Sequence, residues 1–261
     1  MDRITIIKVG GKVVEESESL NSLLNQFCKI SGNKIMVHGG GRSATEIANR
    51  LGIETQMVNG RRITDAATLE IVTMVYGGLV NKKIVAGLQS RGINSVGLTG
   101  VDLDLIRANK RPVGEIDYGF VGDVKNVNTR ELRLLLSENV IPVVAPLTHD
   151  GKGNLLNTNA DTIASELAVA LTNHFNVYLF YCFEKKGVLS IPDDDNSVIS
   201  DLNAALFKEY QENGIISAGM IPKLENGFRA KQKGVKEVLI TNPDNVAKGK
   251  GTRILFGKQP S

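Results

Sequence analysis

Short runs of apolar, mostly β-branched residues alternate along the chain with segments whose apolar residues recur at helical spacing. The runs are nearly continuous in Val, Ile and Leu, which is typical of strands covered on both faces in a parallel sheet. They predict strands at residues 4–9, 34–38, 95–98, 140–145, 177–183 and 235–241. The periodic segments predict helices at residues 18–30, 43–51, 66–75, 81–90, 129–138, 161–171, 202–211 and 223–232.

The repeated strand-then-helix order predicts an α/β fold with an open, mostly parallel central sheet sandwiched by helices. Residues 104–128 break this order, because they hold short alternating runs with glycines and a proline, which favour β-hairpins projecting from the body. A fresh strand follows a long helix near residue 175. We therefore expect two lobes, residues 1–174 and residues 175–261.

Composition narrows the classes of function. The chain has 261 residues, of which 42% are hydrophobic, so it can bury a large core. A net charge of only +3 and the absence of Trp argue against a nucleic-acid partner. We find no signal peptide and no apolar run long enough to span a membrane, so we expect a cytoplasmic protein. Cys28 and Cys182 lack metal-type spacing, and we expect core thiols and no metal site built by the protein.

Two glycine clusters each follow a predicted strand: "KVGGKVV" at residues 8–14 and "HGGGRSA" at residues 38–44. The second also leads directly into a helix. Both clusters would place backbone N–H groups at the carboxyl edge of the sheet, where anions bind. Two tight turns without a ligand are the alternative, but five glycines exceed what two turns need.

Known phosphate motifs fit the second cluster poorly. Gly39, Gly41 and Ala44 nominally match the dinucleotide fingerprint, but Arg61 and Arg62 lie where that fold needs an acidic residue. No P-loop pattern occurs. What remains is a nest of N–H groups preceded by Lys8, which suits a phosphoryl group in transit. An NAD-binding oxidoreductase stays as a rival hypothesis.

Six motifs follow one another over nearly the whole chain: "IIKVGGKV", "VHGGG", "NGRRIT", "LLNTNADTIASELA", "GIISAGMIPKLENG" and "GTRI". Together they resemble the amino acid kinase family. Within it they look most like the branch that uses ATP to phosphorylate the γ-carboxylate of N-acetyl-L-glutamate, the second step of arginine biosynthesis. The resemblance implies β-hairpins over the substrate site, an N-terminal lobe that binds the acyl amino acid and forms a homodimer, and a C-terminal lobe that binds the nucleotide.

The resemblance also implies roles for residues at the matched positions. Lys8 and Lys223 would clamp the transferred phosphoryl group, and Asp161 would organise the two lysines. Arg62 and Asn157 would hold the α-carboxylate of the substrate. Backbone N–H groups for the phosphate and the attacking carboxylate would come from four glycines: Gly10, Gly11, Gly40 and Gly41.

Elementary chemistry is consistent with this set. A γ-carboxylate with a pKa of about 4.3 is already ionised at neutral pH, so the nucleophile needs no general base. The obstacle is electrostatic, because a carboxylate must approach an anionic phosphate. Positive charge and positioning are then what catalysis requires. Two lysines, glycine N–H groups and Mg²⁺ held mainly by the nucleotide phosphates would supply them.

The stretch "LFYCFEKKGVL" at residues 179–189 departs from the family's Ser/Thr-Asp-Val-x-Gly pattern. Lys185 and Lys186 are candidates to meet the phosphates there, although they can equally cap a loop. This departure leaves a second hypothesis open, in which the protein is a non-catalytic small-molecule sensor with a degenerate nucleotide site.

Residues 104–128 are also atypical, and they lie where the N-acyl group is expected. N-succinyl-L-glutamate is therefore the alternative acceptor, with Arg107, Lys110 or Arg111 available to pair a second carboxylate. The chain begins at its first strand, whereas arginine-regulated members carry an additional N-terminal helix. We accordingly expect a dimer that is insensitive to arginine.

Overall fold

The computed structural model describes residues 1–58, 61–191, 194–216 and 219–256. Parts of two motifs quoted above, residues 59–60 and 217–218, lie outside the described residues. Residues 257–261 at the end of the expected C-terminal lobe lie outside them as well.

The main sheet is open and mostly parallel, which confirms the predicted fold class. Its eight strands lie in the order β12-β14-β13-β11-β1-β2-β8-β5, and among them β14 runs antiparallel to β13. The six predicted strands match observed ones to within two residues. The strands of this sheet are β1 (Arg3–Val9), β2 (Asn33–His38), β5 (Ser95–Leu98), β8 (Ile141–Val144), β11 (Asn176–Cys182), β12 (Asp201–Leu202), β13 (Glu237–Thr241) and β14 (Thr252–Ile254).

This sheet runs through both expected lobes. β1 pairs in parallel with β11 over seven residues, from Arg3 opposite Asn176 to Val9 opposite Cys182. The expected boundary near residue 175 therefore falls inside one continuous sheet, between strands of the N-terminal and C-terminal halves. The division into two lobes stays a prediction.

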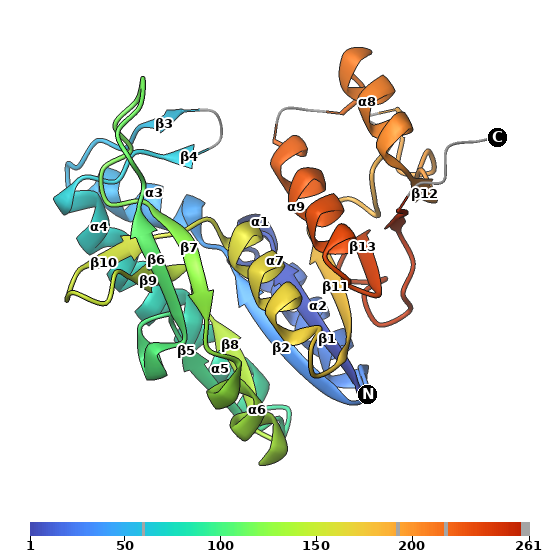
Figure 1. Cartoon of the computed structure of the whole chain (residues 1–261), viewed down its shortest axis with the longest axis horizontal. Coiled ribbons are helices and arrows are strands. Elements are labelled where there is room, and N and C mark those ends of the chain that lie inside the picture. The colour runs from blue at the N-terminus through green and yellow to red at the C-terminus, as the bar shows by residue number, and fades with distance from the viewer. Residues whose placement is uncertain (59–60, 192–193, 217–218, 257–261) are drawn as a thin grey trace.

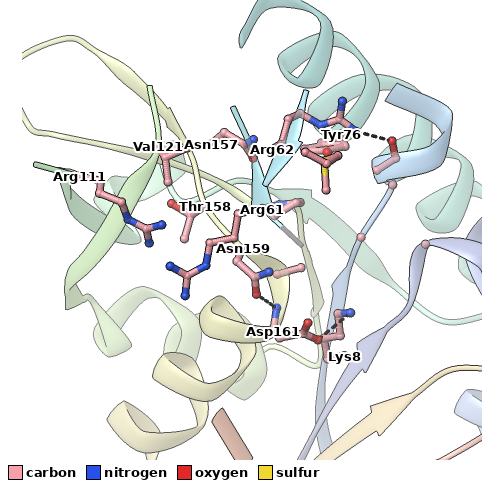
Figure 2. A pocket seen from close by; sticks show the side chains of 17 residues that line it. Lys8, Arg61, Arg62, Tyr76, Arg111, Val121, Asn157, Thr158, Asn159 and Asp161 are labelled. Atoms are coloured by element: carbon pink, nitrogen blue, oxygen red, sulfur yellow. Dashed lines mark hydrogen bonds and ion pairs between the residues drawn. The ribbon is translucent and has the colours of Figure 1, made fainter. Parts of the chain in front are cut away.

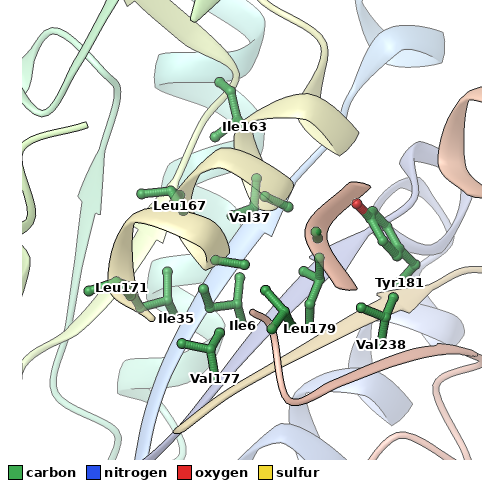
Figure 3. Close-up of a cluster of buried hydrophobic side chains, with 14 of the residues drawn as sticks. Ile6, Ile35, Val37, Ile163, Leu167, Leu171, Val177, Leu179, Tyr181 and Val238 are labelled. Carbon is green, nitrogen blue, oxygen red and sulfur yellow. The ribbon is translucent and has the colours of Figure 1, made fainter. Parts of the chain in front are cut away.

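Helices cover both faces of the sheet (Figure 1). Apolar side chains of the two faces form two separate clusters. Figure 3 shows one of them, in which Leu167 and Leu171 pack over Ile35 and Val177 of the sheet. The helices of this face are α6 (Thr129–Ser137), α7 (Ala160–Leu171), α8 (Ala204–Glu212) and α9 (Ile221–Gln232). Those of the other face are α1 (Gly11–Glu15), α2 (Ser17–Lys29), α3 (Gly41–Arg50), α4 (Ala66–Val72) and α5 (Asn81–Gln89).

The helices predicted at 66–75 and 81–90 form one run. A π-helical segment, η1 (Thr73–Val80), joins α4 to α5. By length and composition alone the run Ala66–Gln89 could cross a membrane, as many core helices could. Ile71, Val75 and Ile84 of this run are buried in the core cluster.

A second sheet lies beside the main one in the order β10-β9-β6-β7. β6 (Ile106–Lys110) and β7 (Gly122–Val127) are antiparallel, which confirms a hairpin within residues 104–128. Figure 1 shows this hairpin on the same side of the molecule as the short ribbon of β3 and β4. The elements that were not predicted include β3 (Met57–Val58), β4 (Arg61–Arg62), η2 (Asp102–Asp104), β9 (Leu147–His149) and β10 (Leu155–Asn157).

Candidate active site

Alternation along β1 sends Lys8 to the face covered by α7 and α9. Ile4 and Ile6 belong to the apolar cluster of that face, whereas Ile7 and Val9 belong to the cluster of the opposite face. Because side chains alternate along a strand with period two, Lys8 shares the face of Ile4 and Ile6. Lys8 is buried, so its ammonium group needs a counter-ion.

Asp161 supplies that counter-ion from the first turn of α7. The Lys8 Nζ lies 2.7 Å from Asp161 Oδ1, and the Lys223 Nζ, carried by α9, lies 3.6 Å from Oδ2. Asn159 caps α7 by accepting the N–H of Asp161, which fixes the start of the helix. The structure thus brings together the three residues with predicted catalytic roles. Those roles themselves stay predictions.

Two opposing effects set the ionisation of Asp161. Burial raises the pKa of this carboxyl, but the charges of Lys8 and Lys223 act against burial and hold the pKa below its ordinary value. Asp161 is therefore an anion at neutral pH. It neutralises part of the charge of the two lysines and leaves a net positive cluster at the carboxyl end of β1.

The two glycine turns meet beside this cluster. A Cβ on Gly39 would lie 3.3 Å from the nitrogen of Gly11, so the turns approach more closely than most side chains allow. Gly40 has φ +154°, and a Cβ there would lie 3.1 Å from Cδ1 of Tyr76. Within the described residues, the N–H groups of Gly11, Gly40 and Gly41 have no protein acceptor. They form an anion-binding concavity at the N-terminus of α3.

Gly10 differs from the other three glycines. Its N–H donates to the carbonyl oxygen of Cys182 at 2.8 Å, so this group is not available to a phosphate in this conformation. A Cβ on Gly10 would lie 3.3 Å from Cβ of Phe183. The close approach of β11 accounts for glycine at this position, and the geometry gives no support to a phosphate contact by its N–H.

A cavity of about 220 Å³ extends from Lys8 and Asp161 toward the β6–β7 hairpin. Figure 2 shows that side chains from distant parts of the chain, including Arg62, Arg111 and Asn157, surround it. The predicted residues that line this cavity are Lys8, Gly11, Gly40, Gly41, Arg62, Asn157 and Asp161.

Arg62 and Asn157 present polar groups to one wall of the cavity. The Arg62 Nη2 donates to the Gly41 oxygen and to Thr45 Oγ1, both at 2.7 Å. Its Nη1 is buried and has no partner among the described residues. The Asn157 amide is oriented by donating to Thr64 Oγ1 at 3.0 Å. A buried guanidinium nitrogen without an acceptor is suited to receive a carboxylate from a ligand.

Lys185 and Lys186 do not line this cavity. The Lys185 Nζ lies 3.7 Å from Asp195 Oδ1 on an exposed loop. Lys186 makes no ion pair among the described residues. The structure therefore does not bring these two lysines to the group formed by Lys8, Asp161 and Lys223, and their predicted phosphate contacts stay untested.

Several cavity residues were missed or left undecided from the sequence. Tyr76 reaches the cavity from the π-helical segment, and Thr158 and Val121 reach it from the second sheet region. The family resemblance singled out Arg62, yet Arg61 lines the cavity as well. No local pattern distinguishes these residues, since only the tertiary fold brings them to one place.

His38 ends β2 on the face opposite Lys8. Its Nδ1 lies 2.7 Å from the Gly39 oxygen, and its Nε2 lies 3.1 Å from Nδ2 of Asn81. Burial, with smaller contributions from nearby lysines, lowers the pKa of His38 to about 4. His38 is thus a neutral, hydrogen-bonded residue that supports the second glycine turn.

Comparison with known proteins assigns the chain to a family. Residues 3–242 match the model of the amino acid kinase family. Acetylglutamate kinase of Parabacteroides distasonis is 61% identical over 254 residues, covering 97% of this chain and 100% of that protein. Acetylglutamate kinase of Bacteroides thetaiotaomicron is 62% identical, covering 97% and 98%. The crystal structure of smu.665 from Streptococcus mutans matches with TM-score 0.81 and 29% identity, covering 97% and 99%. The chain therefore belongs to the amino acid kinase family.

Proposed function

We propose that the protein is a kinase that transfers a phosphoryl group from ATP to the γ-carboxylate of an N-acyl-L-glutamate, as acetylglutamate kinases act in arginine biosynthesis. The observation that carries the proposal is the Lys8–Asp161–Lys223 cluster beside a glycine turn with unused N–H groups. The 61% identity to a curated acetylglutamate kinase supports N-acetyl-L-glutamate as the reference acceptor.

The chemistry follows from where the charges lie. The γ-carboxylate is already ionised, so the site has to place it and the γ-phosphate in contact and to neutralise the charge that they share. In this proposal Lys8 and Lys223 approach the transferred group from the two sides of Asp161. The N–H groups of Gly11 and Gly40 bind the oxygens between them. No histidine is required, which agrees with His38 facing away.

Arg62 and Asn157 position the acceptor by its α-carboxylate. The Arg62 Nη1, which has no partner among the described residues, and the oriented Asn157 side chain support this role. Arginine suits a carboxylate that stays in place because its planar fork forms two parallel hydrogen bonds.

ATP use is implied by membership of the family, and Mg²⁺ is part of the proposal. Within the described residues, no three His, Cys, Asp or Glu side chains lie together in a way that could hold a metal ion. Asp161 is the carboxylate that lines the cavity, and two lysines already engage it. Mg²⁺ would accordingly be held by the nucleotide phosphates and would neutralise their charge. The nucleotide would sit over the C-terminal half, as predicted from the sequence.

We further propose that the protein is a homodimer that pairs through the helical run Ala66–Gln89. Met74 and Leu79 of this run are each 55% exposed, which is unusual for large apolar side chains. Val101, which lines a hollow beside the same run, is also exposed. Leu79→Glu should convert a dimer to a monomer in light scattering, whereas the exposed but more distant Leu134→Glu should not. An unchanged mass for Leu79→Glu would place the interface elsewhere.

The activity is tested by trapping the acyl phosphate with hydroxylamine in the presence of ATP, Mg²⁺ and N-acetyl-L-glutamate. Product that depends on both substrates supports the kinase. Binding of the acceptor without product, for every N-acyl-glutamate tried, would instead favour the sensor hypothesis. NADH titration followed by fluorescence addresses the oxidoreductase, for which we expect no binding.

Arg62→Met tests the acceptor contact in the same assay. We expect the KM for the acceptor to rise by about tenfold or more, with a smaller change in kcat, because the α-carboxylate contact is present before and during transfer. Arg50→Met on the exposed end of α3 is the matched control. Loss of kcat at unchanged KM would assign Arg62 to the transfer step instead.

A further inference from the structure

We propose that the Tyr76 hydroxyl is a further acceptor-binding group, which donates a hydrogen bond to the same α-carboxylate as Arg62. This inference rests on the proposed function, because it concerns the acceptor of that reaction. Tyr76 lies in none of the motifs that carry the family resemblance, and the π-helical segment η1 brings it to the cavity.

The phenol of Tyr76 is buried and borders the cavity. The residue is only 6% exposed, and its ring packs in the apolar cluster on the α2 face of the sheet. The side chain lines the cavity, and Figure 2 shows it next to Arg62. A buried tyrosine usually has a partner for its hydroxyl, as Tyr181 has in the carbonyl oxygen of Asp161 at 3.3 Å. Among the described residues no acceptor takes the proton of the Tyr76 hydroxyl, so a ligand in the cavity can.

Contacts with the second glycine turn fix the position of this hydroxyl. A Cβ on Gly40 would lie 3.1 Å from Cδ1 and 3.3 Å from Cε1 of Tyr76, so one edge of the ring lies against the turn. A Cβ on Gly41 would lie 3.9 Å from the phenol oxygen and 3.8 Å from Nη2 of Arg62. The hydroxyl and the guanidinium therefore approach the same point at the start of α3 and can reach one carboxylate together.

Tyr76 keeps its proton at neutral pH. Burial raises the pKa of the phenol, and the nearby charge of Arg62 only partly opposes this effect. Because a guanidinium has only donors, the phenol oxygen faces it as an acceptor and the O–H points elsewhere. A hydrogen bond from such an O–H to a carboxylate is charge-assisted and stronger than one between neutral groups.

The acceptor has two carboxylates, and their surroundings decide which of them the hydroxyl meets. In the proposed function the γ-carboxylate lies at the Lys8 end of the cavity, beside the glycine N–H groups. The α-carboxylate lies at Arg62, whose buried Nη1 has no partner among the described residues. Since the Tyr76 hydroxyl lies beside this guanidinium, it meets the α-carboxylate. A carboxylate offers about four lone-pair sites, so Tyr76 can share it with Arg62 and Asn157.

The hydroxyl would add discrimination between acceptors. A ligand without an α-carboxylate would leave Arg62 Nη1 and the Tyr76 hydroxyl unpaired in a largely buried site, which is unfavourable for both groups. A ligand that carries this carboxylate satisfies both. Phenylalanine retains the ring contacts with Gly40 and removes only the hydroxyl, so Tyr76→Phe isolates this contribution.

The first test measures Tyr76→Phe with N-acetyl-L-glutamate, ATP and Mg²⁺ in the hydroxylamine assay. We expect the KM for the acceptor to rise by about tenfold, with kcat within about threefold of wild type, because the contact is present before and during transfer. Tyr178→Phe is the matched control, since Tyr178 lies on β11 outside this cavity, with its ring under the guanidinium of Arg3. A KM within about twofold of wild type overturns the inference and leaves the kinase intact.

The second test separates carboxylate binding from support of the glycine turn, through the dissociation constants of two partial analogues measured by calorimetry. N-acetyl-L-norvaline keeps the α-carboxylate and lacks the γ-carboxylate, whereas 4-acetamidobutanoate keeps the γ-carboxylate and lacks the α-carboxylate. Tyr76→Phe should weaken binding of N-acetyl-L-norvaline by about tenfold and change that of 4-acetamidobutanoate by less than about twofold. Equal losses for both analogues would assign Tyr76 to support of the turn. A loss confined to 4-acetamidobutanoate would place the hydroxyl at the γ-carboxylate, and either result overturns the inference.

The calorimetric test does not depend on turnover. If the wild-type protein forms no acyl phosphate, the proposed function fails. A tenfold loss of N-acetyl-L-norvaline binding in Tyr76→Phe would still support the contact with the α-carboxylate.

Discussion

The neighbouring strands β1 and β2 both end in buried polar side chains, but these lie on opposite faces of one sheet. Lys8 is aligned with Val37, and His38 is aligned with Val9, so alternation sends the lysine and the histidine to different sides. Lys8 meets a carboxylate from α7, whereas His38 meets the amide of Asn81 from α5.

The two faces of the sheet therefore differ in role: the Lys8 face carries the proposed catalytic residues, and the His38 face supports the second glycine turn. On the Lys8 face the environment keeps charges: Asp161 is held ionised and borders the cavity. On the His38 face the environment removes charge: the pKa of His38 is lowered to about 4, and its ring holds the Gly39 carbonyl. The second glycine turn is thus held in position by His38 on one face of the sheet. Its N–H groups would bind a ligand in the cavity on the other face.

Replacement of Lys8 should have the largest effect. Lys8→Met removes a buried charge at the proposed point of transfer and should lower kcat by about 10³-fold, in the range measured when a preorganised electrostatic contact is lost. Lys12→Met is the control, because Lys12 lies nearby but its side chain is 40% exposed and pairs loosely with Glu184. A kcat within tenfold of wild type would mean that the charge of the transition state is neutralised elsewhere.

Asp161→Asn should chiefly lower stability. It leaves Lys8 buried without a counter-ion, and breaking such a pair costs about 3–5 kcal/mol of unfolding free energy. Because the pKa of Asp161 is lowered in the fold, its stabilisation is present above the ordinary pKa near 4 and is lost as the pH falls through the lower folded value. Urea unfolding should therefore show a larger gap between wild type and variant at pH 7 than at pH 3. The double variant Lys8→Met/Asp161→Asn should lose less than the sum of the single variants.

His38, on the opposite face of the sheet from Lys8, should make stability depend on pH. Its pKa is about 4 in the fold against 6.5 in the unfolded chain, so the unfolded state binds the proton first as the pH falls. The contribution of His38 is complete above pH 6.5 and is lost by about 3 kcal/mol as the pH falls to 4. His38→Gln should flatten the stability profile over this range, whereas His174→Gln on the exposed surface should not. An unchanged slope for His38→Gln would mean that His38 is not buried as a neutral ring.

Lys223→Met should have the smallest of these effects. Lys223 is carried by α9, its side chain is 24% exposed, and it lies farther from Asp161 than Lys8 does. We expect kcat to fall by about 10²-fold, about 3 kcal/mol in barrier height, with acceptor binding retained. Lys231→Met, on the last turn of the same helix, is the control. Near-normal turnover of Lys223→Met would show that its assignment to the site is wrong.

The sequence predicted the central strands well because their apolar runs are continuous and their ends carry glycine or polar residues. It missed α1, whose five residues are too few for a periodic pattern, and the short strands β9 and β10, which depend on pairing between distant segments. The π-helical segment was also missed, since its apolar residues read as the end of one helix and the start of another.

The candidate site was only partly predictable from the sequence. Lys8 was a candidate because it precedes a glycine cluster at the end of a predicted strand, but its link to Asp161 came from the family resemblance. The meeting of Arg61 with Arg111 depends on a short ribbon and a hairpin that converge in space, and no spacing along the chain encodes it. Single segments of the sequence reveal isolated charged residues, whereas the tertiary fold determines which of them lie together.

The π-helical segment η1 has a consequence for how the chain can tolerate insertion or deletion. Tyr76 within it packs against Gly40, while Asn81 immediately after it bonds to His38, so one helix braces both ends of the same short loop. Removing one residue from a helical segment rotates the residues beyond it about the helix axis. Deleting a residue between Tyr76 and Asn81 would turn one of the two away from its contact. The spacing of five positions between Tyr76 and Asn81 therefore matches the length of the loop. An insertion or deletion in this helix would need a matching change in the loop.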